Sequence, residues 1–297
     1  MTELLSASAK HLTGESELSR AVDEQAECTA VLPLEGNLFQ ISFFAPEIAR
    51  RARPGEFAQI RLEDGDVPLL RRPFSFSRAH PETGEIAFYV GVVGAGSRRL
   101  RRFAPGQRAR ILGPLGQGFT LPDRPGRSAV ISGGLGAAPF PLLTEVLLQR
   151  GEEVVWINGA RTAAELYPED LVPAGVGHLI RLTEDGRSGS LGRVTEGLEA
   201  HLRTAQRAYA CGPNQMLAAV FTSLAKASGQ PAALAELEVS IEAPMGCGFG
   251  TCLGCAIPMR MTQGDECALG LCCRQGPVFP ASTLDWQRLL TQPAHLE

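Results

Sequence analysis

Two rhythms of apolar and polar residues divide the chain. From about residue 28 to residue 121, short β-like runs alternate with Gly and Pro turn signals. The runs span residues 39–45, 57–62, 85–93 and 107–112. Many short strands at this spacing predict an antiparallel barrel or sandwich rather than a helical domain.

The rhythm changes at about residue 122. Short apolar runs, each long enough for a buried strand, then alternate with helical stretches. The runs span residues 128–132, 154–157, 178–183 and 207–211, and helical stretches end at 149 or span 194–202 and 214–227. This order predicts a parallel sheet with crossover helices, which binds ligands at the carboxyl ends of its strands.

After Gly229 the pattern offers one more strand, at 235–241, and then a tail rich in Gly and Cys. A tail with so little periodicity cannot bury a conventional core, so it needs another source of stability, such as a bound metal. The sequence therefore predicts an α/β plus all-β protein in four parts: a flexible extension (1–26), an antiparallel β-barrel domain (27–124), a parallel-sheet α/β domain (125–232) and a small C-terminal subdomain (233–297).

Composition narrows the class of protein. Hydrophobic residues make up 44% and charged residues 20%, the balance of an ordinary globular protein, and the formal net charge of -4 argues against a nucleic-acid binder. No apolar run approaches the ~20 residues that span a bilayer, so we expect no membrane segment. Clustered cysteines favour a metal site in the reducing cytoplasm over disulfides.

Six of the eight cysteines lie between residues 247 and 273. The first three, Cys247, Cys252 and Cys255, have the C-x4-C-x2-C spacing of plant-type [2Fe-2S] ligation, which a more distant cysteine completes. Glycines between them let backbone N–H groups approach cluster sulfurs. We interpret this region as an iron-sulfur site.

A structural zinc site and plain buried cysteines are the alternative interpretations. Zinc usually takes two short ligand pairs, whereas the first loop here already supplies three ligands. The spacing alone leaves the fourth ligand open among Cys267, Cys272 and Cys273.

A glycine-rich turn follows the apolar run at 128–132 and opens a helix. Its residues include Gly133, Gly134, Gly136 and Pro139. Open N–H groups at a helix N-terminus suit a pyrophosphate, although a plain tight turn has the same sequence. A second strand-to-helix junction holds Cys211, Gly212 and Pro213, so both turns should face one crevice for a dinucleotide.

The run Arg-Arg-Pro-Phe-Ser at residues 71–75 places a guanidinium, an aromatic face and a hydroxyl close together. This set suits a flavin, while the alternative is an exposed Arg pair before a strand edge. Gly96 and Ser97 form a second phosphate-friendly turn. The arginines at 98–102 either form a solvated face or hold anionic groups of a cofactor or partner.

Together these motifs resemble the ferredoxin reductase-like flavoproteins with a [2Fe-2S] cluster, and most closely the type 1B dihydroorotate dehydrogenase electron-transfer subunits. The resemblance covers nearly all of the chain after about residue 26, including a signature from Thr183 to Thr195. It implies flavin contacts at Arg72, Pro73, Phe74, Ser75, Tyr89, Val90, Gly91, Gly96 and Ser97. It implies dinucleotide contacts at Gly133, Gly134, Gly136, Pro139, Cys211, Gly212 and Pro213.

For the metal, the resemblance implies four ligands. In that family a ligand cysteine stands three residues before Gly-Pro-Val-Phe, which here selects Cys273 to join Cys247, Cys252 and Cys255. In one departure, Gly91 stands where the family often carries Arg, which removes a charge-assisted phosphate contact.

The implied function is electron transfer in pyrimidine biosynthesis. Electrons from FMN in a separate catalytic subunit would pass through the [2Fe-2S] cluster and FAD of this chain to NAD, and the two subunits would form a heterotetramer. A substrate barrel would need roughly 250 further residues, so a partner polypeptide is required. NAD is favoured by the resemblance, although Arg161 follows the second parallel strand, where a 2′-phosphate could be held.

Two rival functions share parts of this pattern. A subunit of a related flavin-iron-sulfur NAD(P)H reductase, serving ferredoxin, sulfide or a hydrogenase, would have the same fold and cofactors. A zinc-stapled regulatory protein that binds nucleotide without turnover would have the same cysteines and glycine turns.

Overall fold

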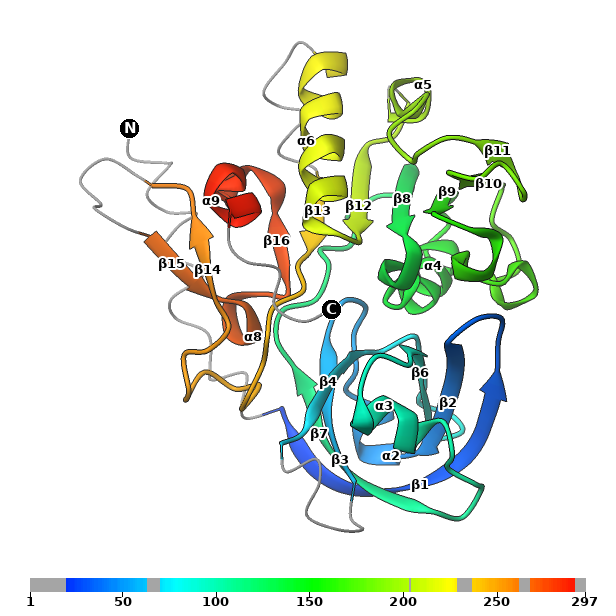
Figure 1. Cartoon of the computed structure of the whole chain (residues 1–297), viewed down its shortest axis with the longest axis vertical. Helices are drawn as coiled ribbons and strands as arrows, with labels where there is room; N and C mark the ends of the chain where they lie inside the picture. Colours follow the sequence, from blue (N-terminus) through cyan, green and yellow to red (C-terminus); the bar gives the residue numbers. More distant parts are fainter. Residues whose placement is uncertain (1–19, 63–69, 203, 229–236, 262–267, 292–297) are drawn as a thin grey trace.

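The computed structural model describes residues 20–62, 70–202, 204–228, 237–261 and 268–291. Within these ranges the strands form two seven-stranded sheets and one two-stranded sheet. Figure 1 shows the first sheet, mostly in blue and cyan, curled below the second, whose strands run from green to yellow-orange with β16 in red. The expected combination of an antiparallel barrel, a parallel sheet and a small C-terminal region is confirmed.

The first sheet is an antiparallel barrel with the strand order β4-β3-β7-β1-β2-β6-β5. Its strands are β1 (Val22–Pro33), β2 (Leu38–Phe44), β3 (Phe57–Leu62), β4 (Arg72–Ser75), β5 (Arg78–His80), β6 (Glu85–Gly91) and β7 (Arg108–Leu115). In β2, Phe39, Ile41 and Phe43 are fully buried. This period of two places one face of the strand in the core of the barrel.

Strand β1 corrects one expected boundary. It begins at Val22 and pairs with β7 from there, so residues 22–26 belong to the barrel and not to an extension. Among residues 22–27 only Val22 and Ala26 are apolar, so the alternation that marks a strand is faint at this end of β1. The rest of the expected extension, residues 1–19, lies outside the described residues.

The second sheet has the order β11-β10-β9-β8-β12-β13-β16. Its strands are β8 (Arg127–Gly133), β9 (Glu153–Ala160), β10 (His178–Thr183), β11 (Ser190–Leu191), β12 (Arg207–Cys211), β13 (Leu237–Ser240) and β16 (Val278–Pro280). All neighbours are parallel except β13 and β16. The central strands are buried on both faces, as expected when helices cover a parallel sheet.

The helices connect these strands or cover their ends. The α-helices are α2 (Pro46–Ala49), α3 (Ala95–Leu100), α4 (Phe140–Gln149), α5 (Leu198–Leu202), α6 (Asn214–Ser228), α8 (Cys272–Gln275) and α9 (Trp286–Thr291). In α4, Phe140, Leu143 and Leu147 are fully buried, and their spacing of three and four residues forms one apolar stripe. The packing of this stripe in the core holds α4, the helix that follows the glycine-rich turn, in place.

The C-terminal region is joined to the parallel sheet more closely than the expected boundary at residue 232 implied. Strand β13 extends the sheet beside β12, and β16 closes its edge by pairing antiparallel with β13. Between them lies a hairpin of β14 (Ala256–Met259) and β15 (Ala268–Leu271), drawn in orange in Figure 1. The cysteine-rich segment is therefore a long excursion between two strands of the same sheet.

No helix in the described ranges has the length and the apolar character needed to cross a membrane.

Candidate functional site

A cleft of about 520 Å³ lies where the barrel meets the carboxyl ends of β8 and β12. Its walls come from both sheets and from the segment that follows β13. The predicted residues on these walls are Arg72, Pro73, Phe74, Ser75, Tyr89, Val90, Gly91, Gly96, Ser97, Pro139 and Cys211. The fold thus brings together groups from motifs up to about 140 residues apart in the sequence.

The two arginines of the first motif have different surroundings. The Arg71 guanidinium pairs with Asp23 at 2.8 Å and bonds to backbone carbonyls of β3 and β7, so it ties strands of the barrel together. Arg72 lines the cleft, and its Nη1 donates to the carbonyls of Leu70 and Arg71 at 2.8 and 3.2 Å. Arg72 is therefore the guanidinium of this pair that is placed for an anion in the cleft.

Tyr89 provides a polar group for which the described residues offer no partner. Its ring lies 4.9 Å from that of Tyr167, its side chain is buried, and its hydroxyl has no hydrogen-bond partner among the described residues. Burial, and then the neighbouring Tyr167, raise the pKa of Tyr89, so the hydroxyl keeps its proton. A buried hydroxyl at the wall of a cleft fits a polar ligand atom, because an unmade hydrogen bond is costly.

The turn at Gly96 and Ser97 forms the start of α3. The Ser97 hydroxyl accepts hydrogen bonds from the N–H groups of Val93 and Gly94 at 3.0 and 3.1 Å. Its oxygen is therefore used to shape the turn. Gly91 faces Leu135, which would lie 3.2 Å from an added methyl group, so an apolar contact from the other sheet covers this position.

The two glycine turns of the parallel sheet lie against each other. A methyl group added at Gly136 would lie 2.4 Å from the carbonyl oxygen of Cys211, and one added at Gly133 would lie 2.4 Å from the sulfur of Met216. Strands β8 and β12 are direct neighbours, with Ser132 opposite Cys211. The expectation that both turns meet at one sheet edge agrees with this packing. Five of their predicted residues are not among those that line the cleft: Gly133, Gly134, Gly136, Gly212 and Pro213.

The segment after β13 supplies cleft residues that the sequence did not reveal. Ser240, Ile241, Glu242, Ala243 and Met245 line the cleft directly before the cysteine-rich loop. Only the tertiary structure shows that this segment, which leads into the cysteine-rich loop, also lines the cleft.

Glu242 is the ionisable member of this segment. Its side chain is exposed, yet the protein atoms packed around it raise the pKa of its carboxyl by desolvation. Burial, and then the Glu242 carboxyl, raise the pKa of Cys211, which therefore remains a neutral thiol.

The predicted metal ligands lie in one loop region. The N–H of Cys252 donates to the sulfur of Cys247, and the N–H of Cys273 donates to the sulfur of Cys255, each at 3.4 Å. Cys247 and Cys252 are at least partly exposed, whereas Cys255 and Cys273 are buried. The four thiols thus form two pairs, one at the surface and one against the core.

The electrostatics of these thiols differ in the same way. Burial opposes ionisation of Cys247, but N–H groups of Cys252 and Phe249 outweigh it and lower the pKa of the thiol to about 6. Burial, and then Cys255, raise the pKa of Cys273 to about 12. N–H groups aimed at thiolate sulfurs suit an anionic iron-sulfur cluster, so the donor set fits this group.

The structure also bears on the open question of the fourth ligand. Cys272 is fully buried and its thiol points to the carbonyl oxygen of Ile241 at 3.3 Å, whereas Cys273 faces Cys255. Cys267 lies outside the described residues. Within those residues, no three His, Cys, Asp or Glu side chains converge as they would around a single metal ion.

Arg161 stands where the sequence offers a contact to a 2′-phosphate, and its guanidinium forms an exposed ion pair with Glu165 at 2.8 Å.

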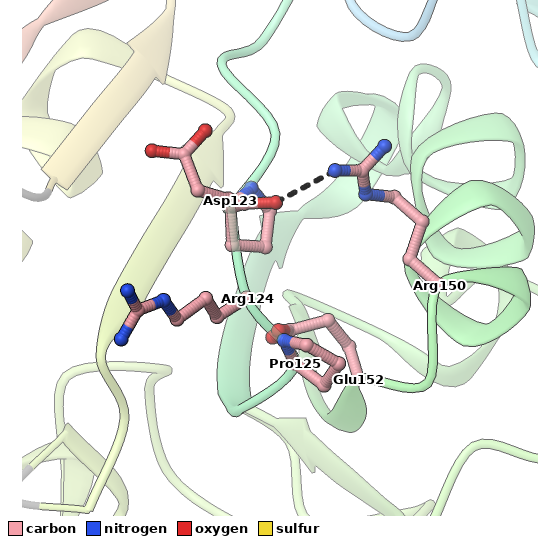
Figure 2. Close-up of a pocket in the computed structure, with 6 residues that line it drawn as sticks. Asp123, Arg124, Pro125, Arg150 and Glu152 are labelled. Carbon is pink, nitrogen blue, oxygen red and sulfur yellow. Dashed lines mark hydrogen bonds between the residues drawn. The ribbon is translucent and has the colours of Figure 1, made fainter.

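A second, smaller pocket lies at the opposite end of β8 (Figure 2). There Arg150 donates to the carbonyl of Pro122, and the buried Glu152 accepts from the N–H of Gly126 at 2.6 Å and from the hydroxyl of Ser128. These contacts hold in place the segment that connects the two sheets, so we assign this pocket a structural role.

Comparison with known proteins identifies the family. Residues 242–285 match the model of the iron-sulfur cluster binding domain of dihydroorotate dehydrogenase B. The chain is 35% identical over 264 residues to a protein of Desulforamulus reducens named dihydroorotate dehydrogenase B (NAD(+)), electron transfer subunit, covering 88% of this chain and 98% of that one. The chain belongs to this electron transfer subunit family.

Other members and solved structures agree with this family and its fold. The Geobacillus thermodenitrificans member is 35% identical over 86% of this chain and 92% of its own. The solved NADH-dependent reduced ferredoxin-NADP oxidoreductase is 25% identical, with a TM-score of 0.75 over 90% of this chain and 92% of that one. A ferredoxin NADP+ reductase from Neisseria gonorrhoeae, solved with bound FAD and NADP, shares the fold at 18% identity, with a TM-score of 0.60 over 73% of this chain and 97% of that one.

Proposed function

We propose that this chain is the electron-transfer subunit of a cytoplasmic, NAD-linked dihydroorotate dehydrogenase. Its cofactors are FAD and a [2Fe-2S] cluster, and its soluble redox partner is NAD. When bound, nicotinamide exchanges an electron pair as a hydride, the flavin splits the pair, and the cluster carries single electrons.

The continuity of the cleft with the cysteine loop carries this proposal. Residues 240–243 and Met245 form one wall of the cleft, and Cys247 follows two positions after Met245. The same short segment therefore borders both the flavin cleft and the cluster loop. Two redox groups held at the ends of this segment are close neighbours.

The barrel side of the cleft would hold the flavin. Arg72, Pro73, Phe74 and Ser75 present the motif from β4, and Tyr89, Val90 and Gly91 present the facing end of β6. Gly96 and Ser97 contribute the start of α3. Arg72 would pair with a phosphate, and the Tyr89 hydroxyl would gain the partner that the protein alone does not provide.

The sheet side would receive the dinucleotide. Gly133, Gly134 and Gly136 keep the backbone open, Pro139 and Cys211 reach the cleft, and Gly212 and Pro213 shape the second turn. The thiol of Cys211 stays neutral, so it places no negative charge beside the nicotinamide.

Cys247, Cys252, Cys255 and Cys273 would bind the cluster. The tip of this loop is open to a partner, because Leu253 is 61% exposed directly beside Cys252. We place the FMN-containing catalytic subunit on this exposed tip, which offers a short path to the cluster, and we expect a heterotetramer.

Reconstitution tests the function. The anaerobically purified chain, mixed with a dihydroorotate dehydrogenase catalytic subunit, should give dihydroorotate oxidation coupled to NAD reduction, and light scattering should report two copies of each chain. NADP in place of NAD should give clearly slower turnover. A protein that contains iron, sulfide and FAD but supports no catalytic subunit of this class would contradict the proposal.

The same experiment also tests the rival reductase function. If the chain reduces ferredoxin with NADH or NADPH and does not couple to dihydroorotate, the reductase function replaces ours. A colourless protein that contains zinc and no iron would favour the regulatory alternative.

A further inference from the structure

Gln59 is a buried polar residue that does not line the cleft. It lies on β3, its side chain has no exposed surface, and both its amide nitrogen and its carbonyl oxygen have no hydrogen-bond partner among the described residues. Buried side-chain amides are nearly always hydrogen-bonded, since an unmet donor or acceptor destabilises the fold. Gln59 therefore indicates a missing partner.

The amide of Gln59 lies against the cluster loop. A methyl group added at Gly248 would be 2.5 Å from Nε2 of Gln59, with Cγ and Cδ at 2.6 and 2.9 Å. Gly248 has a φ of +84°, a left-handed backbone conformation that favours glycine. The Gln59 side chain fills the space that a side chain at this position would need. Gly248 directly follows Cys247, a predicted ligand whose sulfur accepts the N–H of Cys252.

Gln59 is also next to the flavin motif. In the barrel it pairs across β3 and β4 with Pro73, and residues opposite each other in an antiparallel pair share one face of the sheet. Pro73 lines the cleft. One side chain thus stands between the flavin motif and the cysteine loop.

We propose that Gln59 is a positioning residue of the iron-sulfur site, whose Nε2 amide donates a hydrogen bond to a sulfur of the loaded cluster beside Cys247. The inference rests on the proposed function, because it requires the cluster. It makes the barrel one wall of the cluster site, in addition to the loop that carries the ligands.

A hydrogen bond to a cluster sulfur favours the reduced state, since the added electron increases the negative charge on sulfur. Removing the donor should therefore make the cluster harder to reduce. Gln59→Leu removes both polar atoms at similar size, and Gln59→Glu keeps the shape while replacing the N–H donor with a negative oxygen.

The experiment is a redox titration of the cluster in the full chain, followed by electron paramagnetic resonance. We expect Gln59→Leu to lower the equilibrium constant for cluster reduction about tenfold, which is ~59 mV for a one-electron couple. Gln59→Glu should lower it further. Gln40→Leu, the same change at a barrel glutamine opposite Tyr89, should leave it unchanged.

A measurement on the wild-type protein tests the proposal even if the variants fail to bind the cluster. With ¹⁵N in the glutamine side-chain amides, pulsed resonance of the reduced cluster should show a nitrogen coupling. This coupling should persist in Gln275→Leu, which removes the glutamine that follows Cys273 in α8.

The outcomes separate the two proposals. An iron-free wild-type protein would contradict the proposed function itself. A loaded wild-type protein without glutamine nitrogen coupling, or a loaded Gln59→Leu variant with an unchanged potential, would overturn only the role of Gln59.

Discussion

The cofactor cleft and the cysteine loop are neighbours that are built in opposite ways. The cleft is formed by strand ends and buried side chains, such as Phe57, Tyr89 and Cys211, which are all at most 4% exposed. The loop from Gly246 to Gly254 contains neither helix nor strand, and its tip at Leu253 is exposed. Its internal order comes from backbone N–H groups that point at cysteine sulfur.

The cleft and the loop therefore owe their shapes to different sources. The packing of two sheets determines the cleft, so the cleft should persist without its ligands. The loop has little apolar surface to bury and should depend on the group that its thiols bind, as small metal sites do. Four predictions test this contrast, from the largest expected effect to the smallest.

Cys252→Ser should remove the cluster completely, because a serine hydroxyl does not replace a thiolate ligand at neutral pH. Iron and acid-labile sulfide analysis measures the loss, while FAD content and NADH-to-flavin transfer should remain largely intact. Cys28→Ala changes a buried cysteine of the barrel and should keep its iron. Full cluster content in Cys252→Ser would refute the ligand assignment.

Gly136→Ala should destabilise the parallel sheet by about 3 kcal/mol, because the new methyl group would meet backbone at 2.4 Å. Gly134→Ala is the matched control: it meets no atom within 4 Å, and its φ of +53° should cost about 1 kcal/mol. Denaturant unfolding compares the two variants. Equal effects would show that the turns do not pack as tightly as described.

Arg72→Leu should weaken FAD binding about ten- to a hundredfold, as expected for the loss of a charge-assisted hydrogen bond worth about 1.5–3 kcal/mol. Arg71→Leu instead removes a partly exposed ion pair to Asp23 and should lower stability by up to about 1 kcal/mol with little change in FAD affinity. Flavin fluorescence titration measures the affinities. The reverse ranking would exchange the roles of the two arginines.

Tyr89→Phe should weaken FAD binding about fivefold, about 1 kcal/mol, and leave the FAD-free protein equally or more stable. The reason is that its hydroxyl has no partner among the described residues, so removing it relieves an unmet donor. Thermal unfolding with and without FAD measures both effects. A destabilised FAD-free variant would mean that the hydroxyl already has a partner in the free protein.

Much of the architecture was predictable because periodicity records burial. The alternation in β2 and the apolar run of β8 predicted their strands within a residue or two. Strand β1 was absent from the predicted runs, with residues 22–26 assigned to an extension, and the edge strand β16 was assigned to a separate subdomain. The two errors have different causes: few apolar residues mark the start of β1, whereas β16 pairs with β13 across the long cysteine-rich excursion, so its partner is distant in sequence.

The sequence by itself determined the local chemistry: the cysteine spacing, the glycine turns, the Arg-Pro-Phe-Ser motif and the two sheet types. Each of these depends on residues that are close along the chain. Only the tertiary structure decided that residues 240–243 and Met245 line the cleft, that Arg72 rather than Arg71 faces it, and that Gln59 reaches Gly248. These three facts depend on contacts between strands of different sheets or on the direction of one side chain, which periodicity and spacing do not encode.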